Sequence, residues 1–204
     1  MSNSMEKKTA LTKQFQDFFQ VELASTQEKL KQVYSVRYRV YCEEFGYEDT
    51  ALFPTEMETD EFDNYSTHCL IIHKATQRPA ACVRLVPAIV KGEDKFLPLE
   101  KCCDQALYKD KIKEMKIDRN KACEISRLAV DGVFRRRSGE SLTRFGDIDI
   151  NINFSDAEQR TFPIIAVAAF LSAKALTALT GKTNMFAMME PFLPRLLKRS
   201  GLLF

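Results

Sequence analysis

The 204-residue sequence contains no tryptophan, only two histidines and six cysteines without a C-x-x-C pair. His68, Cys69 and His73 lie close together, but their spacing matches no usual zinc motif. The N-terminal ten residues, MSNSMEKKTA, are polar and lack the apolar core of a secretory signal. We therefore expect no bound metal, reduced cysteines that serve as small core residues, and a cytoplasmic protein.

Charge is balanced overall but unevenly distributed. The net charge is only +2 at pH 7, which gives no sign of a nucleic-acid partner, and we expect none. Residues 43–63 contain nine acidic and no basic side chains, whereas Lys and Arg dominate residues 109–121. Arg135, Arg136 and Arg137 form a further basic cluster. Such runs are often only solvated surfaces, but they also fit a site with one acidic and one basic edge.

The longest apolar run, residues 162–179, is only marginally long enough to cross a bilayer and contains Lys174. It predicts a buried core helix, so we expect no transmembrane segment. Pro163 suits the first turn of this helix, and Gly181 suits its C-terminal end.

Hydrophobic periodicity predicts an alternation of strands and helices. Strands are expected at 19–24, 68–74, 81–86, 122–130 and 184–189, and helices at 25–44, 103–116, 162–179 and 191–200. This order is typical of an α/β protein with a mixed sheet. We expect a mobile tail over residues 1–15 and a single domain over 16–204, with a sheet that lacks its C-terminal strands.

Several charged residues occupy apolar settings, where an ionised group is costly unless it is paired. Arg37 shares the apolar stripe of the first helix, and Arg84 lies in the second strand of a hairpin. The strand ACEISRLAV contains Glu124 and Arg127. Because Arg binds carboxylates through a bidentate fork, we predict that these arginines pair with the acidic loop. The predicted partners are Glu58, Asp60 and Asp63. Strand alternation places Glu124 and Ser126 on one face and Arg127 on the other.

These charged residues belong to four motifs that follow one another between residues 30 and 130. The first is Arg37 with Tyr41 and Tyr47, and the second is E-x-D-x-x-D from Glu58 to Asp63. Arg84 in CVRLVP is the third, and E-x-S-R from Glu124 to Arg127 is the fourth. In order and spacing they resemble the motifs of acyl-homoserine-lactone (autoinducer) synthases.

This resemblance implies a GNAT (N-acyltransferase) fold and the transfer of a fatty-acyl group from acyl carrier protein to a small amine. The wider group includes N-acyl amino acid synthases. The segments SRLAVDGVFRRRSGE and FLPRLLKRSGLLF look most like acyltransferases of the PEP-CTERM/exosortase system of Gram-negative bacteria. No bound cofactor is implied, because the donor is an acyl carrier protein or CoA thioester.

Two departures from the family pattern affect the substrates. Tyr47 stands where the family normally has Trp, which weakens the case for S-adenosylmethionine as the acceptor. The CoA-binding pattern is matched only imperfectly, by residues 136–141, and the long helix does not follow at once. We therefore expect a carrier-protein donor, with CoA second. Basic clusters would suit an acidic carrier protein.

The resemblance and the chemistry together assign roles to the residues. Glu124 would be the base, and backbone N–H groups near Ser126 to Leu128 would stabilise the oxyanion. The acceptor would lie beside Asp60 and Asp63, with Arg37, Arg84 and Arg127 ordering the loop. The remaining residues, Arg135 to Arg137 with Phe170, Phe186 and Met188, would bind the donor, the last three as an acyl tunnel. The alternatives are an acetyl-CoA-dependent acetyltransferase and a non-catalytic acyl-binding or regulatory domain.

Overall fold

A computed structural model describes residues 13–103, 112, 114–135, 154–189 and 192–199. Its main sheet has five strands in the order β1-β2-β3-β6-β7. Neighbouring strands are antiparallel, except that β6 and β7 are parallel, so the predicted mixed sheet is confirmed. The strands are β1 (Phe19–Leu23), β2 (Thr67–His73), β3 (Arg78–Pro87), β6 (Ala122–Val130) and β7 (Asn184–Ala187).

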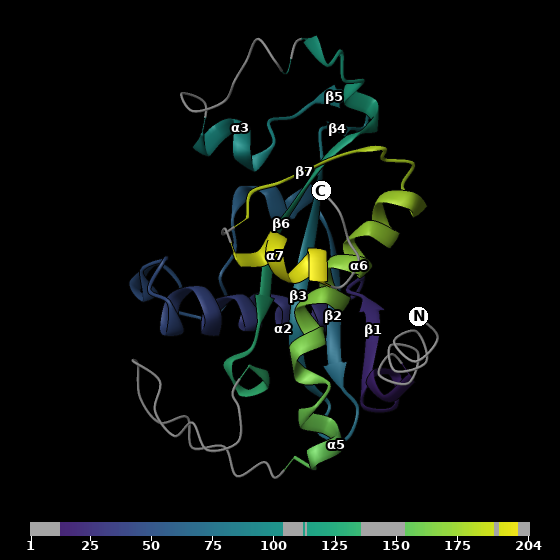
Figure 1. The fold of residues 1–204 in the computed structure, drawn as a ribbon. Coiled ribbons are helices and arrows are strands. Elements are labelled where there is room, and N and C mark those ends of the chain that lie inside the picture. The colour runs from purple at the N-terminus through teal and green to yellow at the C-terminus, as the bar shows by residue number, and fades with distance from the viewer. Residues whose placement is uncertain (1–12, 104–111, 113, 136–153, 190–191, 200–204) are drawn as a thin grey trace, which may run out of the picture.

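Helices cover both faces of this sheet, with α2 on one face and α6 on the other (Figure 1). A two-stranded sheet, β4 (Ile89–Val90) with β5 (Glu93–Asp94), lies near α3 at one end of the molecule. The helices are α2 (Gln27–Arg37), α3 (Pro98–Cys102), α5 (Asp156–Gln159), α6 (Ile165–Leu179) and α7 (Phe192–Arg199).

Helix α2 begins at Gln27 and is capped by Thr26, whose hydroxyl accepts a hydrogen bond from the amide of Lys29 at 3.3 Å. It therefore begins two residues after the predicted start at residue 25. After α2 the chain continues as a π-helix from Tyr38 to Glu44, so helical structure extends to the predicted end. π-Helical segments are rare and frequently occur at functional sites.

The N-terminal segment differs from the prediction. Residues 13–15 were expected in a mobile tail, but they are helical. Phe15 is buried and its ring stacks on that of Phe19 at 5.1 Å, which fixes this part of the chain to the sheet. The helix expected at 103–116 lies mostly outside the described residues, but Ile112 and Glu114 within it are helical. The short helix α3, which precedes it, was not predicted, and it begins with Pro98 at its first position and with Glu100, which accepts from the amide of Leu97 at 2.7 Å.

The apolar run at 162–179 forms α6 after a short 3-10 turn, Phe162–Ile164. Ile165, Ala169 and Ala173 of α6 are fully buried against the sheet, as predicted for a core helix. By length and composition alone, residues 156–179 would be able to cross a membrane, yet half of the apolar stretch is buried inside the protein.

The central strand β6 contains a β-bulge beside β3. Cys82 pairs with Ala129 and Arg84 with Ser126, so Val83 alone faces two residues, Arg127 and Leu128. Arg127 adopts a left-handed conformation, with φ of 49°. The extra residue turns Arg127 to the α2 face, the face of Ser126. The prediction that alternation places Arg127 on the opposite face is therefore wrong.

The bulge coincides with the end of the β6–β7 ladder. This parallel ladder runs from Ala122–Asn184 to Ile125–Ala187. Beyond Ile125, β6 has no ladder partner on that side within the described part of the chain. The edge of β6 that carries Ser126 to Leu128 is thus open there.

Four of the six cysteines are buried core residues, as predicted. Cys42, Cys69, Cys82 and Cys123 are buried and free, and burial raises the pKa of each thiol, to about 11 or 12. They are therefore protonated at neutral pH and act as small apolar residues.

Gly181 ends α6 in a left-handed conformation, with φ of 66°. The amide of Lys182 donates to the carbonyl of Thr177 at 2.8 Å, as in a helix C-cap. Because a Cβ at Gly181 would meet no neighbouring atom, Gly181→Ala should act through the backbone alone. We expect it to lower the free energy of unfolding by about 1 kcal/mol in urea denaturation. Gly181→Asn should cost less, and an equal or larger loss with Asn would contradict this account.

Candidate active site

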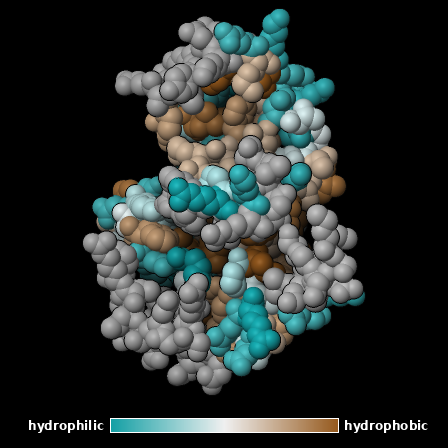
Figure 2. All heavy atoms as spheres, in the orientation of Figure 1, coloured by the Kyte–Doolittle hydropathy of each residue, from teal (hydrophilic) through white to brown (hydrophobic). Residues whose placement is uncertain are grey.

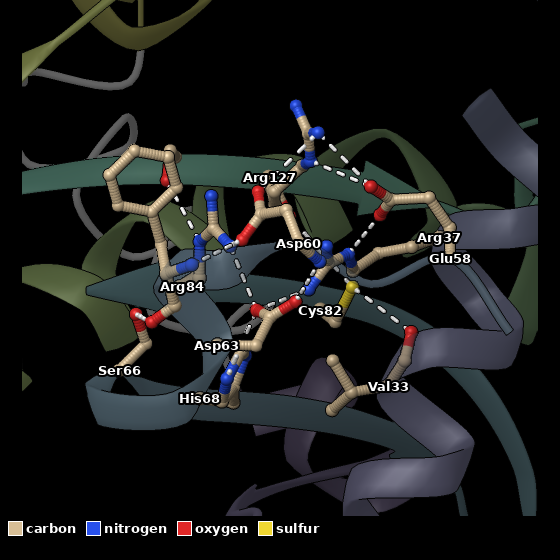
Figure 3. A network of polar contacts seen from close by, with 12 residues as sticks. Val33, Arg37, Glu58, Asp60, Asp63, Ser66, His68, Cys82, Arg84 and Arg127 are labelled. Carbon is tan, nitrogen blue, oxygen red and sulfur yellow. Dashed lines mark hydrogen bonds and ion pairs between the residues drawn. The ribbon is translucent and has the colours of Figure 1, made fainter. Parts of the chain in front are cut away.

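A cluster of arginines and carboxylates occupies the α2 face of the sheet (Figure 3). Arg37 and Glu58 form an ion pair in which both side chains are buried, at 0% and 1% exposure. The other side of the Arg37 guanidinium donates to Asp63 at 2.7 Å. Arg37 thus joins the end of α2 to the acidic loop at two points.

Arg84 of β3 binds the same loop from the sheet. Its Nη1 contacts Asp60 at 2.5 Å and Asp63 at 2.8 Å. Its Nε donates to the hydroxyl of Ser126 at 3.1 Å, which links β3 to β6. The predicted pairing of Arg84 with the loop carboxylates is therefore confirmed.

Arg127 completes the cluster because the bulge points it toward α2. Its guanidinium lies 3.0 Å from Glu58, 3.5 Å from Asp60 and 3.2 Å from Glu48. The pairs with Glu58 and Asp60 were predicted. Glu48 was missed, because it lies in an acidic run that has no periodicity to distinguish one carboxylate from the next.

The spacing of E-x-D-x-x-D has a local structural cause. Asp60 caps a 3-10 helix, Glu61–Tyr65, and accepts from the amide of Phe62 at 2.9 Å. Asp63 Oδ2 accepts from the amide of Asp60 at 2.7 Å, so the two residues form a capping box. Asp63 Oδ1 remains for Arg37 and Arg84. One carboxylate therefore builds the turn and also ties it to two arginines.

The environment of the cluster keeps Asp63 charged and His68 neutral. Burial alone would raise the pKa of Asp63, but hydrogen bonds from Arg37 hold it at about 2. Burial lowers the pKa of His68 to about 4, although its Nε2 lies 3.6 Å from Asp63. Neither ring nitrogen of His68 has a hydrogen-bond partner among the described residues. Neutral His68 beneath the cluster was not predicted, because the strand expected at 68–74 does not show which of its side chains lies below the arginines.

Glu124 lies on the same face but outside the arginine cluster. Its side chain is 2% exposed, and Oε2 accepts from the amide of Leu99 at 2.8 Å. That amide belongs to the first turn of α3, where N–H groups lack helical partners. Burial raises the pKa of Glu124 to about 7, and the hydrogen bond from Leu99 partly opposes this rise. Near neutral pH this carboxylate can therefore both bind and release a proton.

The aromatic residues of the first motif lie together beside Arg127. The hydroxyl of Tyr41 donates to the carbonyl of Leu128 at 2.9 Å, and the Arg127 guanidinium lies 5.4 Å from the Tyr41 ring centroid. Tyr47 is 59% exposed, with its ring 6.3 Å from Tyr41. Phe45, which the sequence reasoning missed, stacks on Tyr47 at 5.3 Å. Together they form an aromatic surface at the edge of the site.

The predicted donor-binding arginines are only partly described. Arg135 forms an ion pair with Glu44, donates to the carbonyl of Val130 at 2.8 Å and lies over the ring of Phe45. The Arg135 guanidinium is thus bound by groups of this protein. Arg136 and Arg137 lie outside the described residues.

The three residues of the predicted acyl tunnel do not line one space. Phe170 packs with Leu197 and Val167 on the α6 face. Phe186 is on the other face, where it lines a cavity beneath α3. Met188 is 67% exposed. The common tunnel is therefore wrong, because the sheet separates Phe170 from Phe186.

Among the described residues, no group of three His, Cys, Asp or Glu side chains could hold a metal ion.

A family model described as an acetyltransferase (GNAT) domain matches residues 36–144, which include the whole cluster. The chain belongs to the GNAT family. Family membership places it among the N-acyltransferases. No curated protein matches the sequence significantly.

Two solved structures extend the comparison to the fold of this GNAT protein. The acyl-homoserine-lactone (AHL) synthase LasI aligns with a TM-score of 0.57 and 15% identity, covering 90% of this chain and 78% of LasI. TofI, in a ternary complex with an inhibitor and MTA, aligns with a TM-score of 0.58 and 17% identity, covering 89% and 77%. The GNAT fold expected from the four motifs is confirmed.

Glu58→Gln should destabilise the protein strongly, because it leaves buried Arg37 without its charged partner. We expect a loss of about 3–5 kcal/mol in the free energy of unfolding, measured by urea denaturation. Glu48→Gln is the matched control, since this carboxylate is 34% exposed and its ion pair among the described residues is with Arg127, and its loss should stay below about 1 kcal/mol. Equal effects of the two substitutions would contradict the central position of Glu58.

The lowered pKa of His68 predicts that the protein loses stability in acid. Its folded pKa of about 4 lies below its ordinary value of 6.5, so stability is full above pH 6.5 and falls as the pH approaches 4. His68→Phe should remove roughly 3 kcal/mol of this decline between pH 7 and 4. Thermal unfolding of both proteins across this range would measure it. If the stabilities of the two proteins changed in parallel between pH 7 and 4, His68 would have to be protonated in the folded state, which would contradict this prediction.

Proposed function

We propose that this GNAT protein transfers a fatty-acyl group from a thioester to the amine of an amino acid or a similar small acceptor. The observation that carries the proposal is the position of Glu124, a buried carboxylate on a strand whose edge is open from Ser126, two residues later, and burial raises its pKa to about 7. The alternatives are an acetyl-CoA-dependent acetyltransferase and a non-catalytic acyl-binding or regulatory domain, and the choice of donor in the activity assay distinguishes them.

In this mechanism Glu124 acts as the general base. It accepts a proton from the acceptor ammonium group, directly or through a water molecule, and the free amine attacks the thioester carbonyl. The tetrahedral oxyanion is stabilised by backbone N–H groups of β6 near Ser126 and Leu128. Collapse of this intermediate forms the amide and expels a thiolate, which takes up the proton that the attacking nitrogen loses, and Glu124 then releases the first proton to solvent. Direct transfer needs no covalent acyl-enzyme.

The acceptor would approach from the acidic loop and the aromatic surface. Asp60 retains 22% exposure of its side chain, and exposed Tyr47 lies beside Tyr41, whose ring contacts the Arg127 guanidinium. A carboxylate and aromatic rings both favour a cationic amine. The arginines, with Glu58 and Asp63, would hold this loop in position rather than touch the reacting atoms.

For the donor we propose acyl carrier protein first and CoA second. Carrier proteins are acidic, and the exposed Arg195 and Lys198 of α7 offer positive charge on the α6 side of the sheet. A cytoplasmic location belongs to the same proposal. Acceptor identity and acyl length would follow from mass spectrometry of lipids extracted from cells that overexpress the protein.

Glu124→Gln should separate catalysis from folding. We expect acyl transfer to fall by about 10²–10⁴-fold, because the amide cannot accept the proton. The free energy of unfolding, in contrast, should rise. The raised pKa means that ionised Glu124 opposes folding as the pH rises from 4.5 through 7, so the variant should gain roughly 3 kcal/mol at pH 8 and little at pH 4.

The measurements are product formation from acyl-carrier-protein, long-chain acyl-CoA and acetyl-CoA donors, and urea denaturation at both pH values. Glu93→Gln, at an exposed carboxylate, is the control and should change neither. Activity restricted to acetyl-CoA would favour the acetyltransferase alternative. No product from wild-type protein with any donor and acceptor would refute the enzyme proposal.

A further inference from the structure

We infer that Arg119 is a positioning residue for the proposed base, Glu124, because it fixes the first turn of α3. The amide of Leu99 in that turn donates to Glu124 at 2.8 Å. The inference rests on the proposed function, in which Glu124 accepts the proton of the acceptor amine. Its test includes a measurement on Glu124 that needs no catalysis, so the two proposals can fail separately.

The Arg119 guanidinium binds two carboxylates and one carbonyl group. Its Nη1 and Nη2 donate to Glu100 at 2.6 Å and 3.2 Å, which is the bidentate arrangement typical of strong Arg–carboxylate pairs. Its Nε donates to Asp94 at 2.7 Å, and Nη2 also donates to the carbonyl of Lys95 at 2.7 Å. Arg119 therefore ties α3 to the end of β5.

Glu100 transmits this attachment to the start of α3. Its Oε2 accepts from the amide of Leu97 at 2.7 Å, at the position where the apolar Leu97 side chain offers no cap. Helix α3 has only five residues, and a helix this short is not stable by itself. Contacts from outside the helix therefore determine where its first amides point. Leu99 directly precedes Glu100, so the same contacts orient its amide.

Arg119 is itself held at the start of β6. It begins a 3-10 helix, Arg119–Lys121, which Asp118 caps and which leads directly into the strand. The carbonyl of Lys121 accepts from the amide of Thr183 at 2.9 Å, just before β7. The surface here is polar, since Figure 2 shows hydrophilic residues in the upper part of the molecule, where β5 lies in Figure 1. A closed chain of contacts thus runs from β6 through Arg119 and α3 back to Glu124 in β6.

Loss of Arg119 would change the surroundings of Glu124 in two ways. Burial raises the pKa of Glu124 to about 7, the hydrogen bond from Leu99 lowers it, and the negative charge of Glu100 raises it. Without Arg119, α3 is less firmly held and this hydrogen bond weakens, while Glu100 loses the cation that neutralises it. Both changes disfavour the ionised carboxylate, so both raise the pKa of Glu124.

The other titratable groups around the proposed base do not depend on Arg119. Arg84 and Arg127 lower the pKa of the base from the sheet, and both are bound to the acidic loop. Cys123 and Tyr65 are uncharged near neutral pH, since burial raises the pKa of both groups. The residues of β7 include no titratable side chain. Helix α3 is therefore the element through which Arg119 affects the base.

Arg119→Gln should shift the pH dependence of acyl transfer, measured as initial rates of product formation. We expect the pKa of Glu124 to rise by about 0.5 to 1, as a weakened hydrogen bond to the ionised form would cause. Because only the ionised base accepts a proton, the rate relative to wild type should fall about three- to tenfold at pH 6 and stay close to wild type at pH 9. A purely structural role would lower the rate by the same factor at both pH values, and that result would overturn the inference.

Two further variants control this experiment. Lys121→Gln removes the same charge from the same 3-10 helix at an exposed residue, and its rate should equal that of wild type at both pH values. Arg119→Lys keeps the charge but loses the bidentate fork, so its fall at pH 6 should be smaller than that of Arg119→Gln. Equal effects of Lys121→Gln and Arg119→Gln would contradict the positioning role, because charge alone would then explain the change.

Titration of Glu124 by carbon-13 NMR provides the measurement that needs no catalysis. The protein is labelled at its glutamate carboxyl groups, and the signal that Glu124→Gln lacks is the one to follow. We expect a pKa of about 7 in wild type and a higher value in Arg119→Gln. This rise without acylated product from wild type with any donor and acceptor would refute the proposed function and leave the role of α3 intact. Product formation with the same Glu124 pKa in both proteins would overturn the inference alone.

Discussion

The buried ion pair between Arg37 and Glu58 is the interaction on which the site depends. It joins the end of α2 to the middle of the acidic loop with almost no exposure to solvent. Removing either partner would leave a charge buried without compensation, so the loop cannot leave the sheet without a large loss of stability. Arg84 and Arg127 attach to the same loop from two strands, and the loop thereby becomes part of the rigid sheet.

The bulge in β6 connects this cluster to the open edge of the sheet. Arg127 adopts a strained left-handed conformation, which costs free energy in a residue other than glycine. Its three contacts with carboxylates offset that cost. The same extra residue coincides with the point where β7 stops pairing with β6. One local distortion thus both assembles the arginine cluster and borders the edge where a thioester carbonyl would be bound.

Residue chemistry predicted much of this site because buried charges need partners. Three inward arginines and one acidic loop allowed few pairings. The face of Arg127 could not be predicted, since the bulge depends on how β6 pairs with β3. The prediction of a single acyl tunnel was wrong for a related reason. Apolar periodicity identifies Phe170 and Phe186 as buried, but it does not show that a sheet lies between them.

Asp63 and Glu124 show why position relative to the arginines decides function. Both carboxylates are largely buried on one face of the sheet, yet their pKa values are about 2 and about 7. Asp63 receives two guanidinium groups, whereas Glu124 receives a single backbone amide from α3. An arginine bound directly to Glu124 would lower its pKa and leave it too weak a base for an ammonium ion. The separation of Glu124 from the cluster therefore suits it to the proposed role of base, and α3 contacts it through the amide of Leu99.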